Sequence, residues 1–262
     1  MLSIASLLLI ISTAAICLLM LHKVRSMHLM LYAQQDGPRR EAELLFQQTE
    51  ALQGLYAELG LEKSLPSTRG WAASPDFLLE LATHVRANRP MTVVECSSGV
   101  STLVLARCMQ LNGSGKVISL EHDGQYAGQT RRQLQRHGLS DWAVIIDAPL
   151  TQYALGDDVW PWYGLGGLPA GQEIDLLVID GPPQAIRPLA RYPAGPLLFG
   201  RLRAGAAVFL DDAARPGEQA ILARWKVEFP LMRQSSRRCE KGCAVLTPLP
   251  WDAVPVPLPV PL

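Results

Sequence analysis

The sequence lacks a net charge, because its 262 residues hold 24 Lys and Arg against 24 Asp and Glu. Proteins that bind nucleic acids over a wide surface need a basic face that attracts phosphates. The one local basic stretch, at Arg131, Arg132 and Arg136, is typical of a solvated helix face. We therefore expect no nucleic-acid partner.

Cysteine is scarce, with five residues at positions 17, 96, 108, 239 and 243. An odd number, with two members inside expected core elements, fits a reducing compartment better than a disulfide framework. Cys239 and Cys243 are four positions apart, but no second pair or nearby histidine completes a zinc site. We interpret these two as ordinary thiols near a terminal hairpin.

Charge is also missing from residues 2–21, which are rich in Leu, Ile and Ala. An apolar run of about 20 residues is long enough to span a bilayer core. A cleaved signal peptide has a positive region before a shorter apolar stretch, and neither feature is present. Because Lys23 and Arg25 follow the run, the positive-inside rule predicts a single-pass membrane anchor with the rest of the chain in the cytoplasm.

The remaining chain divides by composition into further segments. Leu45, Leu52 and Leu59 are seven residues apart, which predicts an amphipathic helix over 41–59. Ser74, followed by Pro75 and Asp76, indicates the start of the next helix. The predicted segments are a transmembrane anchor, an amphipathic helical linker, a ligand-binding domain and an extended Pro-rich tail, at residues 1–25, 26–73, 74–248 and 249–262.

The dinucleotide motif G-x-G-x-x-G is absent. The turn after the first apolar strand reads E-C-S-S-G-V-S-T from Glu95 to Thr102 and keeps only Gly99 of the glycines. A pyrophosphate needs close backbone contact on both phosphates, and a carboxylate beside it would repel it. The same carboxylate attracts an ammonium or sulfonium group. An NAD(P)-dependent oxidoreductase is therefore the disfavoured alternative.

Five apolar runs, each followed by an acid, predict strands of one open sheet. They occupy residues 91–94, 116–120, 143–146, 174–179 and 206–210. Such runs without polar alternation are typical of parallel strands buried on both faces. A basic helix is expected over 125–137, with Gly138 as its C-cap. Because the acids all follow the carboxyl ends of strands, we expect a ligand crevice at that edge of a doubly wound α/β sheet.

These motifs resemble the class I S-adenosylmethionine-dependent methyltransferases. The first turn is similar to a subgroup that carries E-x-G-S-G-V-S-T, with Ser97 in place of the first glycine, and Asp180 opens the D-G-P-P that follows the fourth strand. The resemblance implies a Rossmann-like, mostly parallel sheet with an antiparallel last strand. It also implies S-adenosylmethionine as the cofactor. The implied cofactor-binding residues are Glu95, Ser97, Gly99, Ser101, Glu121, His122, Asp147, Ala148 and Asp180.

The resemblance also suggests a metal site and a base. Asp180, Asp211 and Asp212 correspond to acidic positions that hold Mg²⁺ in catechol O-methyltransferase-like enzymes, and oxygen ligands suit that ion. The lysine that those enzymes place after the first metal aspartate is absent here. Asp180 is the first candidate for the catalytic base and His122 the second.

Aromatic and basic residues suggest an acceptor pocket. Trp160, Trp162 and Tyr163 lie in an insertion that spans residues 151–172, where they either line the pocket or pack on their own loop. The predicted contacts for an anionic or sugar acceptor are Arg187, Arg191 and Tyr192. We therefore expect a membrane-anchored enzyme that methylates an oxygen of a small molecule or glycan. A tethered scaffold without turnover is the non-enzymatic alternative, and the oligomeric state stays open.

Overall fold

The computed structural model describes residues 3–249 of the chain. The chain divides into two compact units, Met1–Gln47 and Gln48–Leu262. A single helix, α1 (Ile4–Leu59), runs through the boundary between the two units. It joins the segment expected as an anchor to the segment expected as an amphipathic helix. The four predicted segment boundaries themselves stay predictions.

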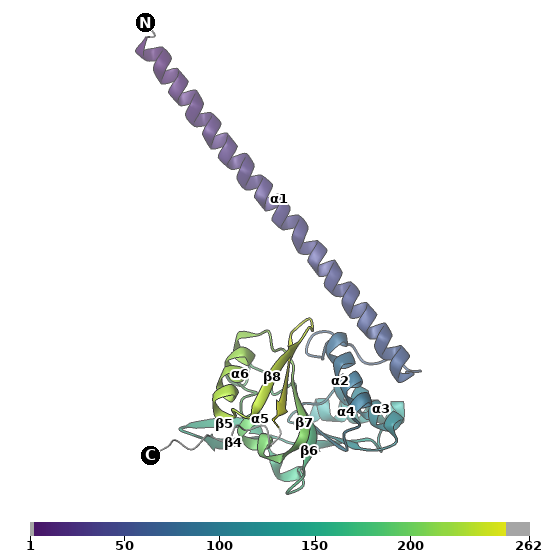
Figure 1. The fold of residues 1–262 in the computed structure, drawn as a ribbon. Coiled ribbons are helices and arrows are strands. Elements are labelled where there is room, and N and C mark those ends of the chain that lie inside the picture. The colour runs from purple at the N-terminus through teal and green to yellow at the C-terminus, as the bar shows by residue number, and fades with distance from the viewer. Residues whose placement is uncertain (1–2, 250–262) are drawn as a thin grey trace, which may run out of the picture. The chain divides into compact units, whose positions relative to one another are not determined.

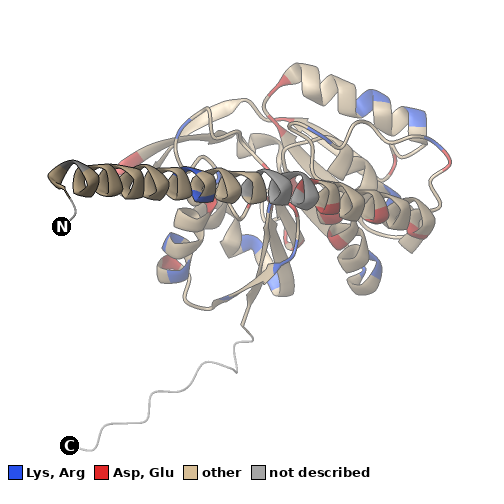
Figure 2. Cartoon of the chain, turned by 90° about the horizontal axis from the view of Figure 1, so that it is seen from above, with Lys and Arg blue, Asp and Glu red and all other residues tan. Residues whose placement is uncertain are grey.

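The first unit consists of the N-terminal part of α1. Its stretch Ser6–Tyr32 is long and apolar enough to cross a membrane, and none of the side chains in its most apolar window is buried. In Figure 2 this stretch is tan except where Lys and Arg are coloured blue. Length and composition therefore suit a membrane span, although a signal sequence would satisfy the same criteria.

The second unit is built on one seven-stranded sheet, shown in Figure 1. Its strands are ordered β3-β2-β1-β6-β7-β9-β8, and only the pairings of β9 with β7 and β8 are antiparallel. The strand bounds are β1 Thr92–Cys96, β2 Lys116–Glu121, β3 Ala143–Asp147, β6 Ile174–Ile179, β7 Leu202–Leu210, β8 Met232–Arg237 and β9 Cys243–Pro248. This arrangement confirms the predicted mostly parallel sheet with an antiparallel last strand.

Helices cover one face of the sheet, and a mixed layer covers the other (Figure 1). Val93 and Val117 belong to the core under α2, α3 and α4, while Val94 and Ile118 belong to the core under α5, α6 and a hairpin. Successive residues thus face opposite layers, which explains why the strand sequences do not alternate. The bounds are α2 Pro75–Asn88, α3 Val100–Asn112, α4 Gly124–His137, α5 Ala194–Leu198 and α6 Pro216–Glu228.

The segment expected as an insertion folds into a separate hairpin. Strands β4 (Leu150–Leu155) and β5 (Asp158–Tyr163) pair with each other across a two-residue turn. Two short 3₁₀ helices, η1 (Leu165–Gly167) and η2 (Phe199–Arg201), complete the described elements. The hairpin places its aromatic side chains in the core on the face opposite α3.

Helix ends follow from local chemistry. Asp123 accepts hydrogen bonds from the backbone N–H groups of Gln125 and Tyr126 at the start of α4, and Gly138 ends the helix in the left-handed conformation, as predicted. At the start of α2 the expected cap is different, because the Ser74 hydroxyl donates to Asp76 instead of accepting from the helix. Asp76 itself accepts the hydrogen bond of a free helix N–H group.

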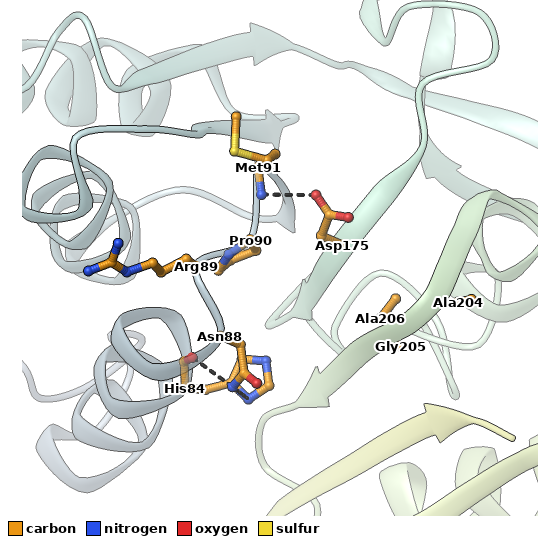
Figure 3. A pocket seen from close by; sticks show the side chains of 9 residues that line it. All are labelled: His84, Asn88, Arg89, Pro90, Met91, Asp175, Ala204, Gly205 and Ala206. Carbon is orange, nitrogen blue, oxygen red and sulfur yellow. Dashed lines mark hydrogen bonds between the residues drawn. The ribbon is translucent and has the colours of Figure 1, made fainter. Parts of the chain in front are cut away.

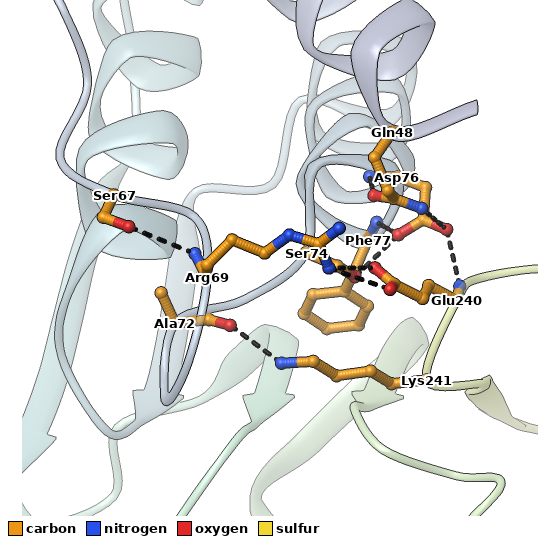
Figure 4. A network of polar contacts seen from close by, with 9 residues as sticks. All are labelled: Gln48, Ser67, Arg69, Ala72, Ser74, Asp76, Phe77, Glu240 and Lys241. Carbon is orange, nitrogen blue, oxygen red and sulfur yellow. Dashed lines mark hydrogen bonds and ion pairs between the residues drawn. The ribbon is translucent and has the colours of Figure 1, made fainter. Parts of the chain in front are cut away.

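The turn between β8 and β9 is fastened to the start of α2, as Figure 4 shows. Asp76 Oδ2 accepts hydrogen bonds from the Glu240 backbone N–H at 2.6 Å and from Gln48 Nε2 at 2.8 Å. Arg69 pairs with Glu240 at 2.9 Å, and Lys241 Nζ donates to the Ala72 carbonyl at 2.9 Å. Cys239 lies in this turn and Cys243 begins β9, and both are free thiols, as expected near a terminal hairpin.

Candidate functional site

Glu95 is buried at the carboxyl end of β1. Its Oε2 accepts hydrogen bonds from Thr102 Oγ1 of α3 at 2.6 Å and from Ser119 Oγ of β2 at 2.5 Å. Burial raises the pKa of this carboxyl group, and the hydroxyl donors oppose that shift. The structure therefore places Glu95 beneath the turn, where it ties β1, β2 and α3 together. From the sequence, its carboxylate was expected beside the bound ligand.

The turn after β1 combines a strained serine with an open glycine. Ser97 has a φ of +119°, a conformation that L side chains rarely adopt. The backbone N–H and the hydroxyl of Ser98 both donate to Glu121 Oε2 at 2.9 Å. A side chain built on Gly99 meets no atom within 4 Å. Free space thus lies directly above the first turn of α3, whose buried Ser101 faces inward.

Glu121 ends β2, His122 follows it, and the Glu121 carboxylate faces this turn. Glu121 is 5% exposed, and its Oε1 accepts a hydrogen bond from the Asp123 backbone N–H at 3.0 Å and lies 3.2 Å from His122 Nδ1. Burial alone raises the pKa of Glu121, but its hydrogen bonds with His122, Asp123 and Ser98 outweigh burial and lower it. The carboxylate is therefore held in its charged form.

The two residues predicted at the end of β3, Asp147 and Ala148, have different surroundings. Asp147 is largely exposed and pairs with Arg131 of α4 at 2.8 Å. Ala148 is buried, and its N–H donates to the carbonyl of Glu121 at 2.7 Å. The Asp147 carboxylate therefore does not join the buried acids.

Three acids meet where β6 and β7 end. Asp180, Asp211 and Asp212 each bring one carboxylate oxygen within 4.8 Å of the other two. Burial, followed by the neighbouring Asp212, raises the pKa of Asp180 to about 6, although Arg191 opposes the shift. Burial, followed by the neighbouring Asp180 and Asp212, raises the pKa of Asp211 well above its usual value. The predicted grouping of these three residues is therefore present.

A buried arginine lies inside this group of acids. Arg191 Nη2 donates to Asp180 Oδ1 at 3.2 Å and to Asp212 Oδ2 at 2.7 Å, and Nη1 donates to the Asp211 carbonyl at 2.8 Å. Arg191 Nε lies 3.8 Å from a fourth buried acid, Glu218 of α6. The sequence analysis assigned Arg191 to an acceptor. This assignment is corrected here, because burial leaves its guanidinium 6% exposed and fully engaged with the loops after β6 and β7.

The other two predicted acceptor residues are also engaged within the fold. Arg187 stacks on the ring of Trp160 at 3.7 Å and donates to a backbone carbonyl of β5. The Tyr192 hydroxyl donates to Glu228 at 2.9 Å. Their contacts therefore favour a structural role over the predicted acceptor role.

Tyr163 and Gly181 lie next to this region. Tyr163 belongs to the aromatic residues that the sequence offered for an acceptor pocket, whereas Gly181 was not assigned to a site. The Tyr163 ring packs edge-on against His122, with the ring centroids 5.7 Å apart. A Cβ added to Gly181 would lie 2.3 Å from the Tyr163 hydroxyl oxygen and 3.2 Å from Ser97 Cβ. The glycine of D-G-P-P therefore makes room for the hairpin and for the turn after β1.

Cavities lie elsewhere in the described residues. One of about 230 Å³ lies at the amino end of the sheet and is lined by His84, Arg89 and Asp175 among others (Figure 3). Another of about 450 Å³ lies between α6 and the β8–β9 hairpin. Neither is lined by a predicted cofactor residue.

Comparison with known proteins identifies the region that holds the site. Residues 94–213 match a family model described as a methyltransferase domain. They run from β1 to the loop after β7 and contain every predicted site residue. No curated protein matches the chain.

Solved structures of similar fold are methyltransferases. A Podospora anserina methyltransferase bound to S-adenosylhomocysteine is 14% identical, covers 76% of this chain and 87% of its own, and has a TM-score of 0.52. An O-methyltransferase from Bacillus cereus, also with S-adenosylhomocysteine, is 19% identical, with 76% and 90% covered and a TM-score of 0.51. TomG, an O-methyltransferase of tomaymycin synthesis from Streptomyces achromogenes, is in complex with S-adenosylmethionine. It is 15% identical, with 78% and 89% covered and a TM-score of 0.50. At these identities the likeness shows a shared fold.

Proposed function

We propose, from the premise that this chain carries a class I S-adenosylmethionine-dependent methyltransferase domain, that the domain methylates an oxygen of a small-molecule acceptor. The observation that carries the proposal is the placement of acids at the carboxyl ends of β1, β2, β6 and β7, which share one edge of the sheet. This edge flanks the β1–β6 boundary, where the strand order reverses and α/β sheets bind ligands.

The turn after β1 fits the cofactor. Gly99 leaves open space at the N-terminus of α3, and Glu121 supplies a charged carboxylate beside it. We assign Glu121 to the ribose hydroxyls, because its lowered pKa keeps it an acceptor of hydrogen bonds. The turn residues Ser97 and Gly99, with Ser101 below them, border the space for the methionine part. The other proposed contacts are Glu95, His122, Asp147, Ala148 and Asp180.

Bound S-adenosylmethionine would supply an electrophilic methyl group on its sulfonium. The residues of this chain must orient the acceptor hydroxyl in line with that methyl group and accept its proton. Asp180 is the first candidate, because a carboxyl group with a pKa of about 6 is mostly ionised at neutral pH. The acceptor oxygen would take the methyl group that bound S-adenosylmethionine supplies, S-adenosylhomocysteine would be the leaving group, and the Asp180 carboxylate would accept the hydroxyl proton. His122 is the second candidate base.

The predicted Mg²⁺ does not fit the acidic group as the structure arranges it. Arg191 already binds Asp180 and Asp212 through their carboxylate oxygens, and Arg215 pairs with Asp212 at 2.8 Å. A divalent cation between the same oxygens would lie beside a guanidinium of like charge. We therefore derive no step through a metal ion.

We further propose that α1 anchors the enzyme in a membrane and leaves the domain in the cytoplasm. The support is the uncharged apolar stretch within Ser6–Tyr32 and the positive residues Lys23 and Arg25 toward its end. A glycan acceptor and a small molecule remain alternatives for the substrate.

Calorimetry on the full chain in detergent tests the cofactor. We expect S-adenosylhomocysteine to bind and NAD not to bind. Glu121→Ala should weaken S-adenosylhomocysteine binding by about 1–3 kcal/mol through the lost hydrogen bonds to a charged group. The exposed Glu62 provides the matched control. Glu62→Ala removes a carboxylate outside the residues predicted to bind the cofactor and should leave the affinity unchanged.

Unchanged affinity in Glu121→Ala would show that the ribose assignment is wrong. Turnover is tested with S-adenosylmethionine that carries a radiolabelled methyl group, added to a small-molecule extract of the producing cells. Transfer of the label supports the enzyme, whereas cofactor binding without transfer to any fraction favours the scaffold.

A further inference from the structure

Arg191 is surrounded by more acidic groups than a single arginine balances. Four carboxylates lie around it, and their side chains are at most 11% exposed: Asp180, Asp211, Asp212 and Glu218. A guanidinium suits such burial, because it is weakly hydrated and presents five N–H donors in a rigid fork. Charge complementarity therefore explains why this arginine is inside the protein.

The contacts of Arg191 join two separate loops. Through Nη2 it binds the carbonyl oxygen of Asp180 at 3.1 Å, as well as carboxylate oxygens of Asp180 and Asp212. Through Nη1 it binds the carbonyl oxygen of Asp211. The first loop follows β6 and the second follows β7, so one side chain fixes the separation between two strand ends. A bridging metal ion would do the same with the same residues.

Some oxygens of the group have no hydrogen-bond partner among the described residues. These are Asp211 Oδ1, Asp212 Oδ1 and Glu218 Oε2. They are the positions that an added cation would use. A direct measurement of metal binding must therefore decide whether the acids are neutralised by Arg191 or by a bound metal ion.

We propose that Arg191 is the resident cation of this acidic group and holds the loops after β6 and β7 in place of a divalent metal ion. Arg191 is thus a positioning residue, and the domain does not require Mg²⁺. This proposal goes beyond methyl transfer. Because its test measures cation binding and stability, its result does not depend on whether the domain transfers a methyl group.

The main test compares two arginine variants in the full chain. Arg191→Met leaves four buried carboxylates without their central cation, and we expect the melting temperature to fall on the order of 10 °C. Millimolar Mg²⁺ should recover part of this loss, and EDTA should remove the recovery. Arg203→Met is the matched control, because Arg203 also pairs with two acids but is half exposed. Its melting temperature should change little and should not respond to Mg²⁺.

The unmodified protein and a conservative variant keep the test decisive. Calorimetric titration of the unmodified chain with MgCl₂ should give no binding, and EDTA should leave its melting temperature and its S-adenosylhomocysteine affinity unchanged. Arg191→Lys keeps the charge and should fold without a response to Mg²⁺, which covers the case in which Arg191→Met does not fold. Binding of Mg²⁺ to the unmodified chain that is lost in Asp211→Asn overturns the proposal. An Arg191→Met protein that is destabilised equally with and without Mg²⁺ also overturns it.

Discussion

Ser97 holds a backbone conformation that costs free energy for any residue with a side chain. Its φ of +119° falls in the region where glycine is at home, and the similar family motif has glycine at this position. A strained residue in such a region costs roughly 1–3 kcal/mol. Its neighbour Ser98 is different, because its hydroxyl donates to the buried carboxylate of Glu121. Two adjacent serines therefore have opposite effects on stability.

We predict that Ser97→Gly stabilises the domain. The gain from relieved strain is partly offset by the greater freedom of glycine in the unfolded chain, which leaves about 1 kcal/mol, or about 2–4 °C in melting temperature. Thermal unfolding of the full chain in detergent measures this. Ser98→Gly is the matched control and should lower the melting temperature, because a hydrogen bond to a charged group is lost. A fall in both variants would mean that Ser97 is not strained.

Residues at strand ends could be predicted from the sequence, whereas buried partners could not. Asp180 and Asp211 follow long apolar runs, so their place at one edge follows from strand direction alone. Arg191 lies in a segment without helical or strand periodicity, so nothing local indicates that its guanidinium is buried between two loops. Glu95 was placed correctly at the end of β1, but its burial depends on Thr102 and Ser119 from other elements.

At the level of elements, the hairpin of β4 and β5 approaches the loop after β6 closely at one point. The Tyr163 hydroxyl occupies the space that a side chain on Gly181 would need. The hairpin pairs with no other strand in the described part of the chain, so its position depends on packing by its aromatic residues. Gly181 therefore links the position of the hairpin to the loop that carries Asp180.

We predict that Gly181→Ala displaces the hairpin and that Tyr163→Phe restores it in the double variant. The added methyl group would meet the hydroxyl oxygen at 2.3 Å, and phenylalanine lacks that oxygen. Gly181→Ala alone should lower stability by roughly 1–3 kcal/mol, the usual cost of overpacking. Denaturant unfolding of both single variants and the double variant gives the coupling free energy. Additive effects would contradict the contact.

The sequence contains a pattern that predicts the hairpin of β4 and β5, although residues 151–172 were interpreted only as an insertion. Gly156 and Asp157 form its two-residue turn, with Gly156 at a φ of +64°, between segments rich in aromatic and β-branched residues. This pattern is typical of a hairpin. The parallel strands were easier to predict, because burial on both faces gives uninterrupted apolar runs. The continuity of α1 was not predicted either, since its two halves differ in composition.

At the scale of the whole molecule, a domain with mixed charges is joined to an apolar helix. In Figure 2 both blue Lys and Arg positions and red Asp and Glu positions occur over the domain, in agreement with the zero net charge. A zero net charge gives the chain as a whole no electrostatic attraction to anionic lipids. The apolar stretch of α1 within Ser6–Tyr32 is the part of the described chain that suits a membrane span.

We predict that the protein stays in the membrane fraction after a carbonate wash and that protease added outside intact cells does not reach its C-terminus. The reason is that the apolar stretch within Ser6–Tyr32 is long enough to span a bilayer and has positive residues toward its C-terminal end. Fractionation followed by detection of a C-terminal tag measures both. Leu8→Lys combined with Ile11→Lys should release the protein, since each charge costs roughly 3 kcal/mol in the bilayer. A shortened soluble product outside the cell would instead establish a cleaved signal peptide.

The place of β9 in the sheet has a consequence for biosynthesis. Cys243–Pro248 lies between β7 and β8, and in the described part of the chain β8 pairs with no other strand. The turn before β9 also fastens the start of α2, about 165 residues earlier in the chain. During translation, β7 therefore keeps an unpaired edge until residue 248 has left the ribosome, while α1 emerges first. The nascent chain must hold this edge apart from other chains while residues 211–248 are made.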